Sequence, residues 1–229
     1  LDKRQLCRFL EYYQLLIEYN EKINLTAITK WEDVVIKHFV DSMSLVKVYG
    51  SLDKLKESTK DKKLVDIGTG AGFPGIPLKI VQNDLKVTLL DSLEKRIRFL
   101  NTVIADNQLP NIQAVHGRAE DFAREKGNRE SYDIGIARAV ASLPVLCEYV
   151  LPFVRIGGLF IAMKGSEIQK ELDEAGKAIS VLGGRIKRVD RFMLPFDPME
   201  RHIISIEKVL QTPTQYPRKS GKPTKSPIQ

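Results

Sequence analysis

The chain has little cysteine and no long apolar run. Of its 229 residues only Cys7 and Cys147 are cysteine, and no paired Cys or His spacing typical of a metal site or a disulfide framework occurs. We therefore expect no bound metal and two reduced, buried thiols in a cytoplasmic protein. No run approaches the length needed to cross a bilayer, and Leu1 opens no signal-peptide pattern, so we expect no membrane association.

Acidic residues are in the minority and are missing from the C-terminal segment. The chain carries 36 Lys and Arg against 29 Asp and Glu, a net charge of +7 that favours a polyanionic partner such as nucleic acid. Residues 212–229 contain no acid, and their prolines and lysines predict an extended, mobile tail. Two interpretations of this tail remain open, a solubilising disordered terminus and a nucleic-acid contact.

The most informative segment is Leu64–Gly75, where a short apolar run leads into closely spaced glycines. An apolar run such as 63–67 is typical of an inner parallel strand. Gly68, Gly70 and Gly72 follow it, and glycine permits positive φ and a close approach of the backbone to a ligand. This pattern predicts a strand that turns sharply beneath a nucleotide-like cofactor.

A second strand and a second acid help to identify the cofactor. Nineteen residues past Gly72, the run at 86–91 ends in Asp91, whose carboxylate could receive both hydroxyls of a ribose. Gly70–Gly75 also fits the dinucleotide fingerprint, but Asp66 lies just upstream and would repel a pyrophosphate. S-adenosylmethionine carries a sulfonium and an ammonium instead, so the acid favours it. NAD(P) and a purely structural glycine turn remain the alternatives.

Helical spacing dominates the chain before the glycine segment. The apolar positions within residues 2–19 predict an amphipathic helix, and Thr29 with Glu32 forms a capping-box pattern for a second helix. His38 falls on the apolar stripe of that second helix, with Asp41 one turn away as a candidate hydrogen-bond partner. No serine or cysteine nucleophile pattern accompanies the pair, so we assign it no catalytic role.

After the helical region, strands alternate with helices, which predicts a doubly wound, mostly parallel sheet. The last two strand-like runs have no helix between them, so we expect an antiparallel hairpin to close the sheet. This combination is typical of the Rossmann-like fold of class I methyltransferases. We divide the chain into a helical cap at 1–61, a cofactor-binding domain at 62–211 and the tail at 212–229. The expected strands are 63–67, 86–91, 112–116, 132–137, 158–163, 185–193 and 202–209.

Several polar residues follow the strands, at the edge where ligands of such sheets bind. Ala119 could offer a backbone N–H and Glu120 a side chain to an adenine, although Glu120 could equally favour a helix N-terminus. Arg138 follows the fourth strand, where it would face the cofactor carboxylate or an incoming phosphate. Lys164 ends the fifth strand and Arg201 begins the return of the hairpin, so we expect both near the same edge.

Two devices of base-modifying enzymes are absent. The clamp used for exocyclic amines, an Asn, Asp or Ser followed by Pro-Pro and an aromatic residue, is replaced by Ala-Arg-Ala-Val at 137–140. Pyrimidine C5 chemistry needs a thiolate, yet Cys147 lies in an apolar helical segment. Transfer to a ring nitrogen such as guanine N7 needs neither device, because its lone pair is already exposed and catalysis can rest on alignment. We therefore assign Arg138 and Lys164 to positioning the substrate.

Taken together, the motifs give the chain a close resemblance to one family over nearly its whole length. They are the Asp66–Gly75 loop, Asp91 to Arg96, Arg118-Ala-Glu120, Ala137-Arg138-Ala139, Asn24-Leu-Thr26, His38-Phe-x-Asp41-Ser42 and the proline-lysine tail from Tyr216. The chain resembles the bacterial small-subunit ribosomal RNA guanine-N7 methyltransferases, also called glucose-inhibited division protein B.

The resemblance implies cytoplasmic methylation of N7 of one guanine in the decoding-region stem-loop of 16S ribosomal RNA, with S-adenosylmethionine as donor. Loss of this activity in the family is associated with low-level streptomycin resistance. The partner would be 16S RNA or the small ribosomal subunit, and we expect a monomer. The implied cofactor contacts are Gly68, Phe73, Ala119, Glu120 and Arg138, with Asp91 at the ribose, and the strand and glycine loop themselves add Asp66, Gly70 and Gly72. The implied basic positions around the cleft are Arg118, Lys164 and Arg201.

Two other functions stay open beside this one. A methyltransferase acting on a small molecule would use the same glycine loop, but the basic tail favours RNA because phosphate contacts dominate RNA affinity. An RNA-binding or ribosome-assembly protein could keep the fold without turnover, although intact Asp66 and Asp91 argue against it. Fold alone does not separate them.

Overall fold

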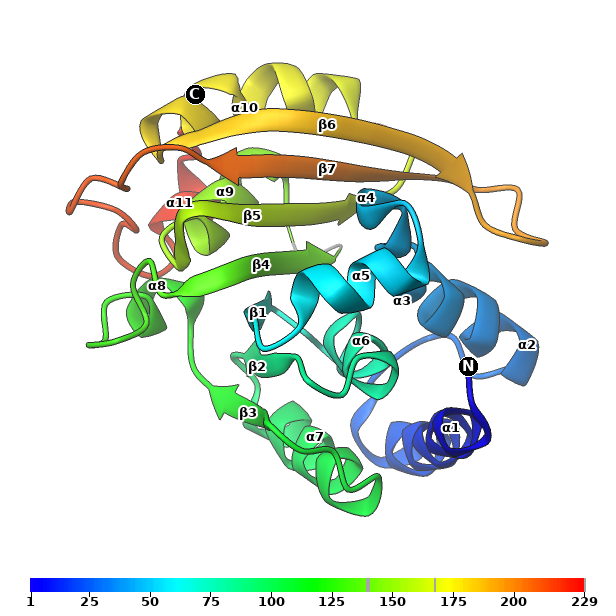
Figure 1. Cartoon of the computed structure of the whole chain (residues 1–229). Helices are drawn as coiled ribbons and strands as arrows, with labels where there is room; N and C mark the ends of the chain where they lie inside the picture. The colour runs from blue at the N-terminus through cyan, green and yellow to red at the C-terminus, as the bar shows by residue number, and fades with distance from the viewer. Residues whose placement is uncertain (139–140, 167, 229) are drawn as a thin grey trace.

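A seven-stranded sheet forms the centre of the protein (Figure 1). The computed structural model describes residues 1–138, 141–166 and 168–228. Within these ranges the strand order is β3-β2-β1-β4-β5-β7-β6, and only β7 runs antiparallel to its neighbours, which confirms the predicted sheet and its closing hairpin. The strands are β1 (Lys63–Ile67), β2 (Lys86–Asp91), β3 (Ile112–His116), β4 (Tyr132–Arg138), β5 (Val154–Lys164), β6 (Gly184–Met193) and β7 (Glu200–Lys208).

Helices cover both faces of this sheet, as Figure 1 shows. The helices of the first half are α1 (Lys3–Ile23), α2 (Trp31–Val34), the π-helix η1 (Val35–Val40), α3 (Asp41–Met43), α4 (Val46–Tyr49), α5 (Leu52–Thr59), α6 (Gly75–Val81) and α7 (Glu94–Asp106). Those of the second half are α8 (Ala119–Phe122), α9 (Leu143–Val150), α10 (Gln169–Val181) and α11 (Lys222–Lys225).

The inner strands are buried on both faces, which explains why they appear in the sequence as unbroken apolar runs. Leu64 and Val65, neighbours on β1, belong to separate buried clusters because successive side chains of a strand point to opposite faces. Helices α1, α6 and α7 pack together on one face, whereas α9 and α10 pack together on the other. The candidate site lies at the carboxyl ends of the parallel strands.

The N-terminal helix forms as predicted and carries its own cap. Asp2 and Gln5 make a reciprocal capping box, in which the Gln5 N–H donates to Asp2 Oδ1 over 2.8 Å and the Asp2 N–H donates to Gln5 Oε1 over 3.0 Å. Phe9, Tyr12 and Leu16 form the buried stripe of α1. This stripe docks the helix on α6 and α7, so the cap and the sheet share one core.

The second predicted helix is broken into short pieces, and its predicted cap is wrong. Lys30 occupies the N-cap of α2 and no side chain caps that end, so Thr29 and Glu32 do not form a capping box. The helix continues as the π-helix η1 and then as α3. Wider π turns are frequent at functional sites, and this one brings His38 and Asp41 to the carboxyl edge of the sheet.

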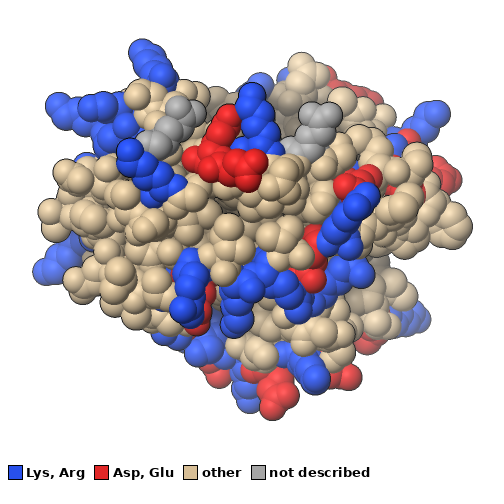
Figure 2. All heavy atoms as spheres, turned by 90° about the horizontal axis from the view of Figure 1, so that it is seen from above, with Lys and Arg blue, Asp and Glu red and all other residues tan. Residues whose placement is uncertain are grey.

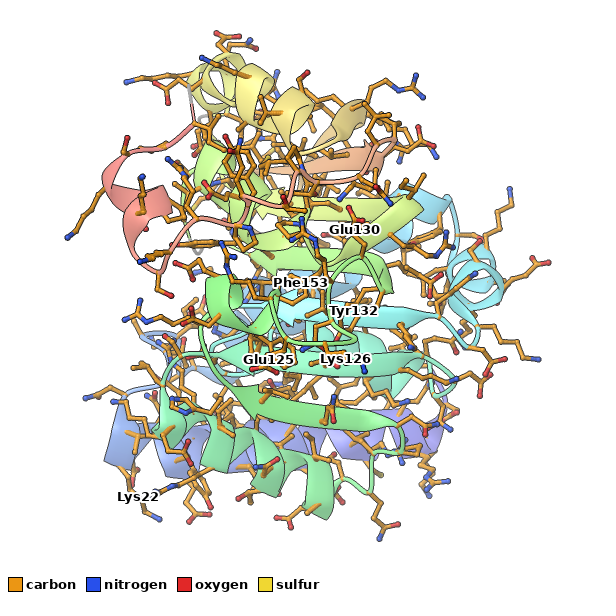
Figure 3. All side chains as sticks on the ribbon, turned by 90° about the vertical axis from the view of Figure 1, so that its left-hand side faces the viewer. Lys22, Glu125, Lys126, Glu130, Tyr132 and Phe153 are labelled. Atoms are coloured by element: carbon orange, nitrogen blue, oxygen red, sulfur yellow. The ribbon has the colours of Figure 1, made fainter. Side chains whose placement is uncertain are left out.

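The C-terminal tail is docked on the domain and is not the extended, mobile segment expected from its composition. The Arg129 guanidinium donates to the carbonyl oxygens of Thr212 and Tyr216 over 2.7 and 2.8 Å. Ile228 is buried. Figure 3 shows the tail beside the connection that carries Glu125, Lys126 and Glu130. Composition alone missed this, because the partners of the tail are arginines and acids on distant elements.

The two cysteines differ in environment. Cys147 on α9 is buried, as predicted, and burial raises the pKa of its thiol far above the usual range. Cys7 is exposed, so the prediction of a buried thiol there is wrong; the apolar stripe of α1 turns this position outward. Among the helices of the described residues, none is long and apolar enough to cross a membrane.

Candidate functional site

The glycine loop between β1 and α6 adopts the predicted left-handed conformations. The φ angles of Gly68, Gly70 and Gly72 are +66°, +63° and +99°. At Gly72 space is also decisive, since a Cβ there would lie 2.7 Å from the Tyr12 hydroxyl. At Gly70 a Cβ would meet nothing within 4 Å, so only the backbone angle requires glycine. The loop therefore presents bare backbone to the space above it.

Asp66 lies beneath this loop and holds it. Its Oδ2 accepts from the Thr69 hydroxyl over 2.7 Å and from the Gly75 N–H over 2.9 Å. The side chain is fully buried, Oδ1 has no hydrogen-bond partner in the described structure, and burial raises the carboxyl pKa to about 6. Asp66 lines none of the three cleft cavities described below, and both of its hydrogen bonds are to the loop.

Asp91, at the end of β2, also binds the glycine loop. Its carboxylate accepts from the Gly70 N–H over 2.9 Å and from the Leu93 N–H over 3.0 Å. Arg96 pairs with it at 3.1 Å. Unlike Asp66, this carboxylate lines two cavities, and it is the point at which they meet.

The first of these, the Glu120 cavity, has a volume of about 230 Å³. It lies over the ends of β1, β2 and β3. The second, the Phe73 cavity, has a volume of about 410 Å³ and lies over the glycine loop. The Glu120 cavity is lined by Ile67, Gly68, Leu90, Asp91, Ser92, Gly117, Arg118, Ala119, Glu120, Ala141, Tyr149 and Thr224. The Phe73 cavity is lined by Leu25, Thr26, His38, Gly68, Thr69, Gly70, Ala71, Phe73, Asp91, Ser92, Arg96 and Arg138.

These two cavities form one cleft with a carboxylate at its middle, because both are lined by Gly68, Asp91 and Ser92. An extended ligand with two end groups and a central diol matches this shape. The adenosine and methionine halves of S-adenosylmethionine are such end groups, and its ribose hydroxyls could donate to Asp91. The residues present therefore fit this cofactor.

A third cavity, the Arg201 cavity, continues the cleft. Its volume is about 310 Å³, and it shares His38 and Arg138 with the Phe73 cavity. These two side chains are thus the wall between the cofactor cleft and a further compartment. The Arg201 cavity is lined by Lys37, His38, Asp41, Arg138, Met163, Lys164, Gly165, Phe192, Met199, Arg201 and His202.

Arg138 is held from several directions. One guanidinium nitrogen donates to Asp41 Oδ2 over 2.8 Å and to the Lys37 carbonyl of η1 over 3.2 Å. The guanidinium carbon lies 5.1 Å from the centre of the Phe73 ring, within the range of a cation–π contact. The predicted position at the sheet edge is confirmed, and these contacts leave the side chain little freedom.

His38 is a neutral side chain stacked on Phe73. The two ring centres lie 4.4 Å apart with planes 16° apart. Arg138 can only donate, so the 3.2 Å contact makes Nδ1 an acceptor and leaves the ring hydrogen on Nε2, which donates to Thr26 Oγ1 over 2.9 Å. Burial, and to a lesser extent the charge of Arg138, lowers the His38 pKa to about 3. Its partners are Thr26 and Arg138, so the expected pairing with Asp41 is wrong.

Asp41 instead joins two of the predicted cations. Besides binding Arg138, it lies 3.5 Å from Arg201 Nε, and Arg201 also pairs with Asp197 at 3.1 Å. Lys164 Nζ contacts Glu171 at 2.7 Å and the Ala141 carbonyl at 2.6 Å. These ion pairs offset the repulsion among neighbouring cations and fix where each one lies.

Arg118 is placed away from the other basic residues. It is the N-cap residue of α8 and lines the Glu120 cavity, whereas Lys164 and Arg201 line the Arg201 cavity. The basic positions expected around the cleft are thus divided between its two ends. Ala119 and Glu120 lie at the predicted end of the cleft, and Glu120 Oε1 accepts from the Gly221 N–H of the tail over 2.9 Å.

Sequence reasoning missed some residues of the cleft. Thr26 lay inside a motif of the family resemblance but received no role. Tyr149 lies on an apolar helix and was indistinguishable from core. Thr224 belongs to the tail, which was expected to be mobile. Only Thr26 carried a signal that could have been used.

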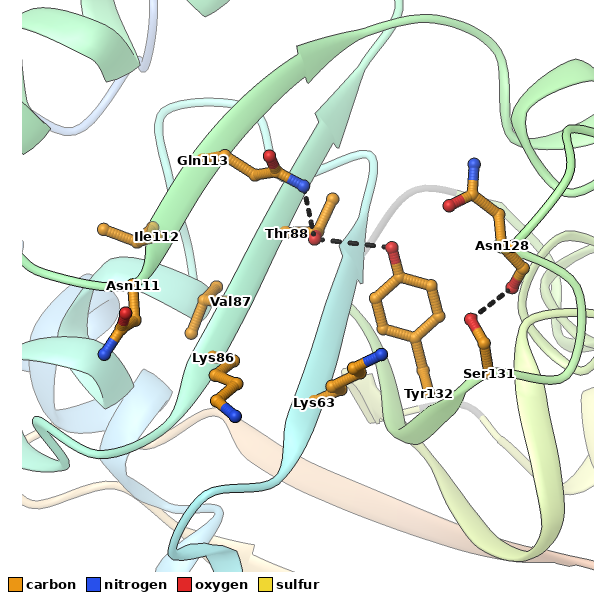
Figure 4. A pocket seen from close by; sticks show the side chains of 11 residues that line it. Lys63, Lys86, Val87, Thr88, Asn111, Ile112, Gln113, Asn128, Ser131 and Tyr132 are labelled. Carbon is orange, nitrogen blue, oxygen red and sulfur yellow. Dashed lines mark hydrogen bonds between the residues drawn. The ribbon is translucent and has the colours of Figure 1, made fainter.

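A fourth cavity, the Lys86 cavity, lies at the other end of the strands (Figure 4). Its volume is about 400 Å³, and it includes Lys63 and Lys86, the first residues of β1 and β2. Thr88 Oγ1 accepts from Gln113 over 3.2 Å inside it. None of its lining residues belongs to the cleft, so it is separate from the site. The described residues hold no cluster of His, Cys, Asp or Glu suited to a metal ion.

Comparison with known proteins identifies the family. Residues 5–204 match GidB, described as rRNA small subunit methyltransferase G. The ribosomal RNA small subunit methyltransferase G of Acetivibrio thermocellus is 52% identical over 100% of this chain and 90% of the relative, and that of Geobacillus kaustophilus is 52% identical over 100% and 93%.

Solved structures agree on the fold. The precorrin-6y C5,15-methyltransferase of Geobacter metallireducens superimposes with a TM-score of 0.53 at 16% identity, over 81% of this chain and 91% of that one. At an identity this low, the likeness supports only a shared architecture. That architecture is a Rossmann-like methyltransferase fold. The match to the family is stronger evidence than this structural likeness, because it covers most of the chain. This chain belongs to the rRNA small subunit methyltransferase G family of S-adenosylmethionine-dependent enzymes.

Proposed function

We propose that this protein transfers the methyl group of S-adenosylmethionine to N7 of a guanine in the decoding-region stem-loop of small-subunit ribosomal RNA. The main support for this proposal is the composition of the Arg201 cavity. Four Lys and Arg side chains and a single acid, Asp41, line it, and His38 and Arg138 separate it from the cofactor cleft. A compartment rich in cations beside the methyl end of the cofactor suits a base that arrives attached to phosphates.

The cofactor would span the two cavities that meet at Asp91. Its adenine would occupy the Glu120 cavity and its methionine the Phe73 cavity. When bound, it supplies an electrophilic methyl group on a sulfonium. The wall that faces this group is suited to a cation, because His38 is neutral and Asp41 balances the charge of Arg138.

No general base is required of the protein. Guanine N7 carries an exposed lone pair and no proton, so the residues need only hold the base in line with the methyl group. The low pKa of His38 makes it a weak base, in keeping with a positioning role. We assign the alignment of the target base to Arg138, with Lys164 and Arg201 toward the RNA backbone.

Surface charge supports an RNA partner over a small molecule. Figure 2 shows Lys and Arg side chains spread across one face of the molecule with fewer acids among them. The net charge of +7 is consistent with this face. The target guanine must leave its stack or lie in a loop to enter the Arg201 cavity. We place the acting protein in the bacterial cytoplasm as a monomer, since one chain supplies all three cavities of the cleft.

The decisive experiment supplies labelled S-adenosylmethionine with free small-subunit RNA in one reaction and whole small subunits in another. We expect label in one of the two, mapped to a single N7-methylguanine by reductive cleavage at that base. Label found only on small molecules of a cell extract would favour the small-molecule enzyme. Cofactor binding and RNA binding without any transfer would favour an assembly protein.

A further inference from the structure

The docked tail reaches the end of the cofactor cleft. The Gly221 N–H donates to Glu120 Oε1 over 2.9 Å, and the Ser220 hydroxyl donates to Asp121 Oδ2 over 2.8 Å. Both acids belong to α8, the short helix that follows β3 at the Glu120 cavity. The tail therefore holds the same carboxylate that the sequence assigned to reading the adenine.

One tail residue lines the cavity itself. Thr224, on α11, borders the Glu120 cavity together with Asp91 and Ala119, although more than a hundred residues separate it from either. Its hydroxyl lies 2.9 Å from the hydroxyl of Tyr149 on α9, and Tyr149 lines the same cavity. The outer side of this cavity thus consists of one helix of the domain and one turn of the tail.

Buried contacts fix the tail in this position. The Glu148 side chain is 1% exposed, and its Oε1 accepts from the Arg218 backbone N–H over 2.7 Å and from Arg218 Nε over 2.9 Å. Further along the chain, Pro223 and Ile228 are buried. A buried carboxylate paired with a tail arginine would be costly to leave uncompensated, so the docked state is favoured.

We propose that residues 216–228 form the outer wall of the adenine site, so that the tail is part of the cofactor-binding machinery. This inference rests on the proposed function only in taking S-adenosylmethionine as the ligand. A tail that served RNA alone would need its lysines exposed but no contact with the cofactor cleft. The contacts of Gly221 and Thr224 with that cleft favour the wall.

Binding and docking must then be coupled in both directions. If the docked tail raises the affinity for the cofactor, the bound cofactor must stabilise the docked tail by the same factor. The tail carries Lys219 and Lys225, both exposed and each followed by serine, so trypsin can report on its docking.

The first test measures binding of S-adenosylhomocysteine by calorimetry without RNA. A chain ending at Gln211 should bind it about tenfold more weakly than the full chain, because the adenine end of the cleft loses Thr224 and the backbone N–H that holds Glu120. Thermal unfolding shows whether the shortened chain is folded. In the full chain, Thr224→Ala should weaken binding by about threefold, since one wall contact and one hydrogen bond are lost. Thr214→Ala, at an exposed tail position outside residues 216–228 and outside the cavity lining, is the matched control and should bind as the wild type does.

The second test uses the unaltered chain. Saturating S-adenosylhomocysteine should slow tryptic cleavage after Lys219 and Lys225 several-fold, while cleavage after the exposed Lys60, far from the cleft, proceeds unchanged. Equal tail cleavage with and without the ligand, together with unchanged affinity in Thr224→Ala, would refute the wall. Failure to bind the ligand at all would count against the proposed function instead, so the two outcomes are distinct.

Discussion

The two ends of the cleft are built by different means. At the Arg201 cavity, charged side chains from α3, β4 and β7 interlock, with Asp41 between Arg138 and Arg201. At the Glu120 cavity, the carboxylates of Asp91 and Glu120 are bound by backbone N–H groups, and small residues such as Ala119 complete the lining with a turn of the tail. If one ion-pair network holds an end of the cleft, loss of a single charged residue of that network should strongly reduce the activity that depends on it. An end made of many modest contacts should tolerate single changes.

The largest expected effect lies in the ion-pair network. Arg138→Ala should lower kcat/KM for RNA methylation by about 100-fold or more, because it removes the group that aligns the target base and leaves the buried Asp41 carboxylate with only the longer contact to Arg201. Arg138→Lys keeps the charge but loses the fork that reaches Asp41 and His38 together, so it should recover only part of the activity. Arg118→Ala changes the other end of the cleft and should cost less than about fivefold. Equal losses at the two arginines would show that the ends do not differ in this way.

The next effect lies where the two cavities meet. Asp91→Ala removes the acceptor of the Gly70 and Leu93 N–H groups and the carboxylate available to a ribose, so affinity for S-adenosylhomocysteine should fall by about 30-fold. Calorimetry measures this directly, with Asp106→Ala on the exposed end of α7 as the control. An unchanged affinity in Asp91→Ala would remove this residue from the site.

A smaller effect is the pH dependence of stability, to which two buried groups contribute in opposite senses. The folded pKa of His38, about 3, lies below its usual 6.5, so the unfolded chain binds this proton more tightly. Its contribution to stability is complete above pH 6.5 and is lost as the pH falls toward 3. Asp66 acts in the opposite sense: its folded pKa of about 6 lies above the usual 3.8, so its contribution is complete below 3.8 and is lost as the pH rises through 6.

His38→Gln isolates the first of these contributions. Urea unfolding at pH 7 and pH 5 should show a smaller loss of stability at the lower pH in this variant than in the wild type. His116→Gln alters an exposed histidine and should keep the wild-type loss. If both variants lose as much stability as the wild type, His38 is not the group that titrates.

Local pattern was sufficient to predict the sheet and the glycine loop. An unbroken apolar run such as 63–67 marks a strand buried on both faces, and the predicted bounds of β1, β2 and β3 match the structure. The left-handed angles of Gly68, Gly70 and Gly72 followed from residue type alone. In these cases the sequence neighbours of a residue determine its conformation.

The site was harder to predict because its partners are far apart in the chain. Asp41 and Arg138 were each noticed, yet nothing local indicates that the carboxylate pairs with this arginine and not with His38 three residues away. The π-helix η1, which brings them together, has no sequence signal of its own. The docked position of the tail could not be predicted for the same reason. Glu148, which binds Arg218, lies seventy residues before it on an apolar helix.

The smallest expected effect concerns Thr26, which acts on the wall between cofactor and substrate through its hydrogen bond to His38. Its hydroxyl accepts from His38 Nε2 and from the Ile28 N–H, and so holds the imidazole flat against Phe73. Thr26→Val keeps the shape but leaves the buried ring N–H unsatisfied, and kcat should fall by about threefold to tenfold, with a smaller loss of affinity for S-adenosylhomocysteine because Thr26 also lines the Phe73 cavity. Thr26→Ser restores the acceptor and should restore the rate. A loss of cofactor affinity equal to the loss of rate would mean that His38 supports the cofactor cleft alone, and that the boundary with the Arg201 cavity is set by Arg138 without it.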